Sequence, residues 1–145
     1  MIDMWAFSDR AGLIVVEHTG EHTSGYEPGS NHVHLSPGLR PRVARSVLAH
    51  ENAHHALGHR PTTDPVSRAK QELAANRWAA ELLITPDRYA AAEAAHNGHV
   101  RSMAVALHVA DELVLTYRGM LERLGGSTYV RPRMGIGQWS FKTAA

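Results

Sequence analysis

One short run restricts both the fold and the chemistry of this chain: His50-Glu51-Asn52-Ala53-His54. It lies in a helical pattern that we expect to cover residues 41–57, with a proline in the first turn and a glycine directly after the last residue. Residues four apart on a helix lie on the same face. His50 and His54 can therefore direct two imidazole nitrogens at one metal ion.

The kind of metal site depends on the residues that follow each histidine. Glu51 can reach a water molecule bound to the ion, as a general base would. A catalytic zinc ion has three protein ligands and one open position, so the sequence must supply a third ligand. The metzincin spacing requires a glycine three residues and a histidine six residues after His54. Those positions hold Leu57 and Arg60, which excludes that arrangement.

Two candidates for the third ligand remain. His59 is nine residues from His50, which is over ~12 Å along a continuing helix, so only a sharp reversal at the preceding glycine would bring it back. Glu72 lies on the next predicted helix, and two antiparallel helices joined by a short loop would place it opposite the histidines. Asn76, one turn later, could accept a hydrogen bond from the outer nitrogen of a ligand histidine. We therefore predict that His50, His54 and Glu72 bind Zn²⁺.

Composition narrows the class of protein. The 145 residues suffice for one domain with its own core. The chain has no cysteine, which excludes disulfides and thiolate chemistry and suits a reducing cytosol, so we expect a cytoplasmic protein. No signal peptide is evident, and no segment reaches the ~20 apolar residues of a membrane span. A formal net charge of +1 gives no basic field that would indicate nucleic-acid binding.

The remaining patterns predict an α+β fold. Two β-rich segments precede the site helix and are expected to form a small antiparallel sheet packed beside the helix pair that carries the metal site. Further helices follow that pair, the last of them divided near Leu107. The stretch after the last helix shows no regular period, so we predict a domain over 1–124 and an irregular tail over 125–145. The predicted strands cover residues 12–18 and 31–35, and the later helices cover residues 64–84, 87–95 and 99–124.

Three segments, residues 48–54, 57–59 and 72–86, together form a more specific pattern. The pattern resembles the ImmA/IrrE family of metallopeptidases, whose motifs read approximately AHELGH, LGH and ExxANxFAxxLLxP. Asn52-Ala53 replaces the usual Leu-Gly and Trp78 replaces Phe, and neither change involves a predicted ligand.

The resemblance implies a zincin-like domain with zinc held by His50, His54 and Glu72 and with Glu51 as general base. It also implies a protein substrate, because members of this family commonly cleave a DNA-binding helix-turn-helix repressor encoded nearby, in phages, mobile elements or stress responses. We therefore expect a zinc endopeptidase that contacts neither nucleic acid nor membrane directly.

Two alternative functions stay open. The segment Met103–Val114 faintly resembles a helix-turn-helix, but the usual turn glycine is absent and His108 stands in the turn, so we favour core packing over a DNA- or protein-binding module. A structural or sensing zinc site could use the same ligands, although it would have no use for Glu51.

The roles of several other side chains are also open. An oxyanion that forms during hydrolysis needs a hydrogen-bond donor, and the sequence does not rank the candidates. His32 and His34 share a strand face, but no acidic partner follows them to complete a second metal site. His55 is expected to point away from the ligands and to be exposed. The oxyanion candidates are Tyr26, Tyr89, His96 and His99.

Overall fold

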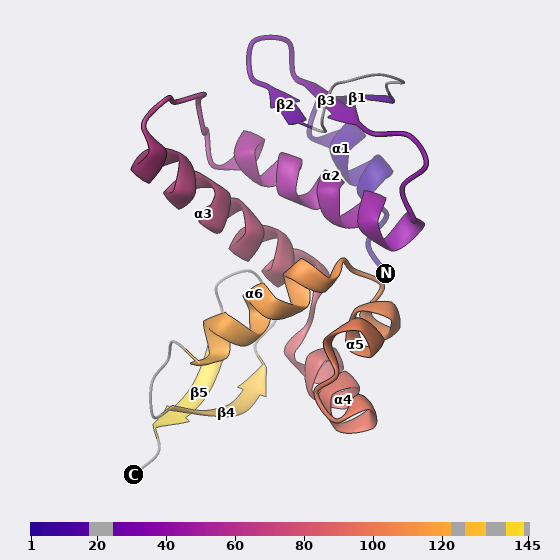
Figure 1. Ribbon diagram of the computed structural model, residues 1–145, viewed down its shortest axis with the longest axis vertical. Coiled ribbons are helices and arrows are strands. Elements are labelled where there is room, and N and C mark those ends of the chain that lie inside the picture. The colour runs from indigo at the N-terminus through magenta and orange to yellow at the C-terminus, as the bar shows by residue number, and fades with distance from the viewer. Residues whose placement is uncertain (18–24, 123–126, 133–138, 144–145) are drawn as a thin grey trace.

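The computed structural model describes residues 1–17, 25–122, 127–132 and 139–143. Within these residues the chain forms six helices, a three-stranded sheet and a two-stranded sheet, so the predicted α+β class is confirmed (Figure 1). The three-stranded sheet and the short first helix lie beside the helix that carries the histidine motif. The later helices lie on the other side of the second site helix (Figure 1).

The first helix, α1 (Met4–Arg10), was not predicted. It begins at Asp3, whose carboxylate accepts hydrogen bonds from the backbone N–H groups of Trp5 and Ala6. Seven residues make only two turns, which is too short for a hydrophobic period to stand out in the sequence. Its buried side chains, Met4 and Ser8, pack toward α2.

The sheet is mixed, and the predicted antiparallel direction of its first strand pair is wrong. Strand β1 (Ile14–Glu17) pairs with β3 (His32–Leu35) in parallel, and β2 (Gly25–Glu27) pairs with β3 in antiparallel direction. The physical reason is β2 itself, which lies in a stretch expected to be only turns. A chain that returns once through an antiparallel strand leaves its first and third strands parallel. The predicted end of the first strand, His18, lies outside the described residues.

The two site helices form as the sequence indicates. Helix α2 (Pro41–Ala56) has a proline in its first turn and is followed by Gly58 with φ +67°, the left-handed conformation that ends many helices. Helix α3 (Pro65–Leu83) begins at Asp64, whose carboxylate accepts from the backbone N–H of Ser67. The two helices run side by side in opposite directions (Figure 1).

Three further helices complete the helical part of the fold. The predicted helix over 99–124 is divided where expected, because His108 adopts φ +56° between its two halves. Asn97 ends the preceding helix in the same left-handed conformation. These helices are α4 (Pro86–His96), α5 (Val100–Leu107) and α6 (Asp111–Glu122). Within the described residues, no helix combines the length and the apolarity needed to cross a membrane.

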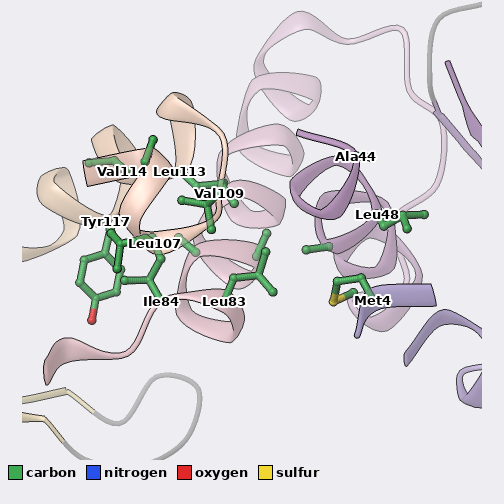
Figure 2. Close-up of a cluster of buried hydrophobic side chains, with 14 of the residues drawn as sticks. Met4, Ala44, Leu48, Leu83, Ile84, Leu107, Val109, Leu113, Val114 and Tyr117 are labelled. Carbon is green, nitrogen blue, oxygen red and sulfur yellow. The ribbon is translucent and has the colours of Figure 1, made fainter. Parts of the chain in front are cut away.

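One hydrophobic core joins these elements. Leu48 of α2 is fully buried, as are Val114 and Tyr117 of α6. Figure 2 shows Leu83, at the end of α3, between Leu48 on one side and Val109 on the other. The core therefore fixes α2, α3 and α6 relative to one another, and these are the three helices around the candidate site.

The segment expected to be an irregular tail contains two strands. Strands β4 (Ser127–Pro132) and β5 (Trp139–Thr143) pair in antiparallel direction, with an irregularity in register between Tyr129 and Arg131. The sequence of β5 begins with alternating apolar and polar residues, but five residues after a glycine-containing stretch are too short a pattern to predict a strand. Residues 123–126, 133–138 and 144–145 lie outside the described part of the chain.

Candidate metal centre

His50 and His54 of α2 and Glu72 of α3 converge on one point. The two Nε2 atoms of the histidines lie 3.1 Å apart. Glu72 places one carboxylate oxygen 3.0 Å from Nε2 of His50 and the other 3.2 Å from Nε2 of His54. Among the described residues, this is the one group of three histidine, aspartate, glutamate or cysteine side chains close enough to hold a metal ion.

The spacing of these three groups fits a tetrahedral ion. Zinc binds histidine nitrogen and carboxylate oxygen at about 2.0–2.2 Å, so tetrahedral ligand atoms lie about 3.3 Å from one another. The nitrogen–nitrogen separation of 3.1 Å is close to that value, and the Glu72 carboxylate reaches the two nitrogens with different oxygens, at 3.0 and 3.2 Å. Ligand atoms taken one from each residue lie within 4.8 Å of one another. The histidines are mostly buried, whereas the Glu72 side chain is 53% exposed, which leaves one side of the group open to solvent.

The outer nitrogen of His50 contacts Asn76. Nδ1 of His50 lies 2.7 Å from the carboxamide oxygen of Asn76, and the carboxamide nitrogen donates to Glu112 of α6 at 3.4 Å. Because the carboxylate of Glu112 can only accept, it fixes which end of the amide faces His50. The proton of His50 is then on Nδ1, and the lone pair of Nε2 points at the ligand group. No pattern in the sequence indicated that Glu112 contacts Asn76.

His59 holds the outer nitrogen of His54 in the same way. The chain does reverse at Gly58, where the N–H of His59 donates to the carbonyl oxygen of His54. This reversal brings Nδ1 of His59 within 2.9 Å of Nδ1 of His54, which is the nitrogen on the far side from Glu72. His59 therefore lies behind a candidate ligand rather than beside the third position.

Glu51 is buried next to the ligand group. Only 7% of its surface is exposed, and this burial raises the pKa of Glu51 to about 7. A protonated His50 would lower this pKa, the negative charge of Glu72 raises it, and a hydrogen bond from the backbone N–H of Tyr26 lowers it. Tyr26 belongs to β2, an edge strand of the sheet, so this edge borders the site.

Two cavities meet at the ligand group. One, of about 330 Å³, lies toward the loop between α2 and α3. The other, of about 310 Å³, lies toward the start of α6. Both are lined by His50, Glu51 and Glu72, so the ligand group lies where the two cavities join into one cleft.

Of the four oxyanion candidates, only Tyr26 lines either of these cavities. Its hydroxyl lies 2.8 Å from Nδ1 of His55, so the predicted exposure of His55 is wrong: the ring is half-buried against Tyr26. Tyr89 is buried in the core, where its hydroxyl accepts from Arg118. His96 and His99 lie at the junction of α4 and α5, and His99 caps α5.

The remaining histidines and the helix-turn-helix hypothesis have structural explanations. His34 pairs with Glu27, an acidic neighbour from β2 that the linear pattern did not show, and His32 stacks on His34. These residues do not form a second group with metal-binding spacing among the described residues. Much of the segment Met103–Val114 is buried, which supports core packing. Its buried residues are Met103, Ala104, Leu107, Val109, Leu113 and Val114.

Comparison with known families agrees with this geometry. A family model described as the IrrE N-terminal-like domain, of the peptidase M78 family, matches residues 10–124. The chain belongs to this peptidase family. The resemblance to ImmA/IrrE proteins is thereby confirmed, and M78 membership makes the chain a metallopeptidase-type domain with a protein substrate. Neither a curated protein nor a solved structure matches it.

Proposed function

We propose that this protein is a zinc-dependent endopeptidase, with His50, His54 and Glu72 as ligands and Glu51 as general base. The observation that carries the proposal is the convergence of His50, His54 and Glu72 within metal-binding distance of one another, beside a buried glutamate and within a cleft. A structural site would be closed and would need no such base, whereas Glu72 is open to solvent and Glu51 lies at the cleft.

The residues divide the work of peptide hydrolysis. Zinc bound by this set would supply Lewis-acid polarisation of the scissile carbonyl and activation of water. Glu51 removes a proton from the attacking water and later delivers it to the leaving amine. Burial raises the pKa of the Glu51 carboxyl, which favours delivery of the proton, whereas the positive charge of a bound ion would favour the carboxylate that removes it. Tyr26 is the oxyanion donor that we retain, because it lines the cavity.

The fold also suggests how a substrate would lie. Among the described strands, β2 pairs along one edge only, and its residues Gly25 and Tyr26 line the cleft. An extended peptide segment could add to this edge and pass the ligand group. We propose, from the family resemblance, that the substrate is a DNA-binding helix-turn-helix repressor of the kind found in phages and mobile elements. A cytoplasmic location suits a chain without cysteine.

The deciding experiment compares the zinc-loaded protein with its Glu51→Gln variant. Loss of a general base lowers the rate by about 10²–10⁴-fold, while zinc binding should persist because Glu51 is not a ligand. Peptide cleavage is followed on a mixed peptide substrate by mass spectrometry, and metal content by elemental analysis. Unchanged cleavage by a zinc-loaded Glu51→Gln protein would reject the mechanism.

A second measurement tests the ligand set. Zinc stoichiometry is determined for the wild-type protein and for Glu72→Ala after dialysis at equal free zinc. We expect the variant to lose stoichiometric zinc, because two histidines without a third ligand bind the ion weakly. Retention of one zinc per chain by Glu72→Ala would show that the third ligand is misassigned.

A further inference from the structure

The two sides of the cleft differ in charge, and the difference lies in residues outside the metal motif. Each side of the cleft is named here after the residues that line it. The arginine arm is the 330 Å³ cavity, which Arg60 and Arg68 line together with Pro28 and Gln71. The aliphatic arm is the 310 Å³ cavity, lined by Val43, Val47, Ala110 and Leu113.

The two guanidinium groups of the arginine arm lack acidic partners. Neither Arg60 nor Arg68 forms an ion pair with any described residue. The acids nearest in sequence contact other groups. Asp64 accepts from the hydroxyl and the backbone N–H of Ser67, and these bonds lower its pKa. Glu72, four residues after Arg68, faces His50 and His54. Two unpaired guanidinium groups lining one cavity make a site for an anionic oxygen pair.

The backbone beneath these arginines is held in place. Gln71 donates its side-chain amide to the carbonyl oxygen of Arg60 at 3.1 Å, which ties the loop to α3. A guanidinium nitrogen of Arg68 lies 3.5 Å from the carbonyl oxygen of Thr62 in the same loop. The loop is therefore anchored at two points. Binding of a ligand by the arginine side chains would then cost little backbone conformational entropy.

The aliphatic arm has the opposite character. Leu113 is buried, Val43 and Val47 are partly buried, and together they offer apolar surface next to His50. Besides Glu51 and Glu72, which line both arms, the acidic residue Glu112 lines this arm and would repel a carboxylate. An aliphatic side chain fits this arm and an acidic group does not.

We propose that the cleft selects a substrate segment with a carboxylate on the arginine side of the scissile bond and an aliphatic side chain on the other. This inference rests on the proposed peptidase function and adds its specificity. The carboxylate has two possible sources, an aspartate or glutamate side chain and the carboxyl terminus of the peptide. Both would be bound through the same guanidinium hydrogen bonds.

Binding, rather than cleavage, tests this proposal. Zinc-loaded Glu51→Gln protein is titrated with fluorescein-labelled peptides that carry one leucine and, at varied distance from it, either glutamate or glutamine. Each peptide is made with a free and with an amidated carboxyl terminus. We expect a glutamate peptide at one spacing to bind about threefold to tenfold more tightly than its glutamine partner. The preference should disappear when Arg60→Gln and Arg68→Gln are added.

Lys70→Gln supplies the matched control. Lys70 lies on α3 two residues after Arg68, is exposed, and lines a different cavity, so the same loss of charge should leave the preference intact. Equal binding of glutamate and glutamine peptides with free or amidated ends would overturn the proposal, and so would a preference that survives removal of both arginines. A preference that depends only on the free carboxyl terminus would support the carboxylate site and identify its source as the chain end.

The aliphatic arm has its own variant. Val47→Ala should reduce discrimination between leucine and alanine at the neighbouring position and leave the glutamate preference unchanged. If Val47→Ala leaves the ratio of affinities for leucine and alanine peptides unchanged, the aliphatic arm does not bind the side chain and that half of the proposal is wrong. Cleavage by the wild-type protein is measured in parallel. Absent cleavage alongside a glutamate preference would contradict the peptidase function and leave the carboxylate site standing.

Discussion

The carboxamide oxygen of Asn76 lies 2.7 Å from Nδ1 of His50, and its nitrogen faces Glu112. This short chain of side chains links α2, α3 and α6, so the orientation of one imidazole depends on three helices. A ligand histidine whose outer nitrogen is held loses less rotational freedom when it binds metal, and its tautomer is already correct.

Replacement of Asn76 by leucine should weaken metal binding. Leucine keeps the branched shape of asparagine but cannot accept the Nδ1 proton of His50, so we expect the affinity for zinc to fall by about 10- to 100-fold. Competition with a chromogenic chelator measures the affinity. The thermal midpoint of the metal-free variant serves as control, since a large drop there would mean that the loss reflects general destabilisation.

Variants at His59 distinguish a supporting role from ligation. Of the two candidate ligand histidines, His59 contacts His54, at its outer nitrogen. We therefore expect His59→Ala to lower zinc affinity by about tenfold and to retain binding at saturating metal. Glu72→Ala should lose far more affinity in the same chelator assay. The reverse order, with His59→Ala the more severe, would make His59 the third ligand.

The close approach of α2 and α3 depends on small residues, and Ala79 tests it. Ala79 is fully buried on the same stripe of α3 as Asn76. Ala79→Leu should push the helices apart, lower the free energy of unfolding by about 1–3 kcal/mol, and weaken zinc binding through misplacement of Glu72. Ala69→Leu is the matched control, because Ala69 is exposed on the same helix. Urea unfolding measures the first effect and chelator competition the second.

The central site could be predicted because two regular features determine it. The helical period places His50 and His54 on one face, and a short loop makes the next helix antiparallel, which brings Glu72 and Asn76 opposite them. The position of His59 could not be predicted in this way. It depends on a single backbone conformation, φ +67° at Gly58, which the sequence permits but does not require.

The parts of the fold that escaped prediction are short or depend on distant residues. Helix α1 has seven residues and strand β2 has three, so neither shows a period. The direction of the β1–β3 pair followed from β2 and was therefore also mispredicted. Glu112 and the two arginines of the cleft become functional candidates only when packing brings separate elements together.

The link between α2 and α6 leads to a pH-dependent prediction. Arg42 of α2 donates to one carboxylate oxygen of Asp111 at 3.1 Å, and Arg101 donates to the other at 2.6 Å. The hydrogen bond from Arg101 is the largest influence and lowers the pKa of Asp111. Burial opposes it, and the hydrogen bond from Arg42 lowers the pKa further, so that the net value lies below the ordinary 3.8. The folded state therefore favours the ionised carboxylate more than the unfolded state does.

The sign of the effect on stability follows from this lowered pKa. The contribution of Asp111 is fully present above its ordinary pKa of 3.8 and is lost as the pH falls through the lower value of the folded state. The difference in free energy of unfolding between the wild type and Asp111→Asn should be constant near neutral pH and shrink toward zero in acid. Urea titrations across this range measure the difference. In an Arg101→Gln background the same difference should be smaller at every pH above 3.8. A difference that stays constant into strong acid would mean that Asp111 stabilises the fold through its shape and not through its charge.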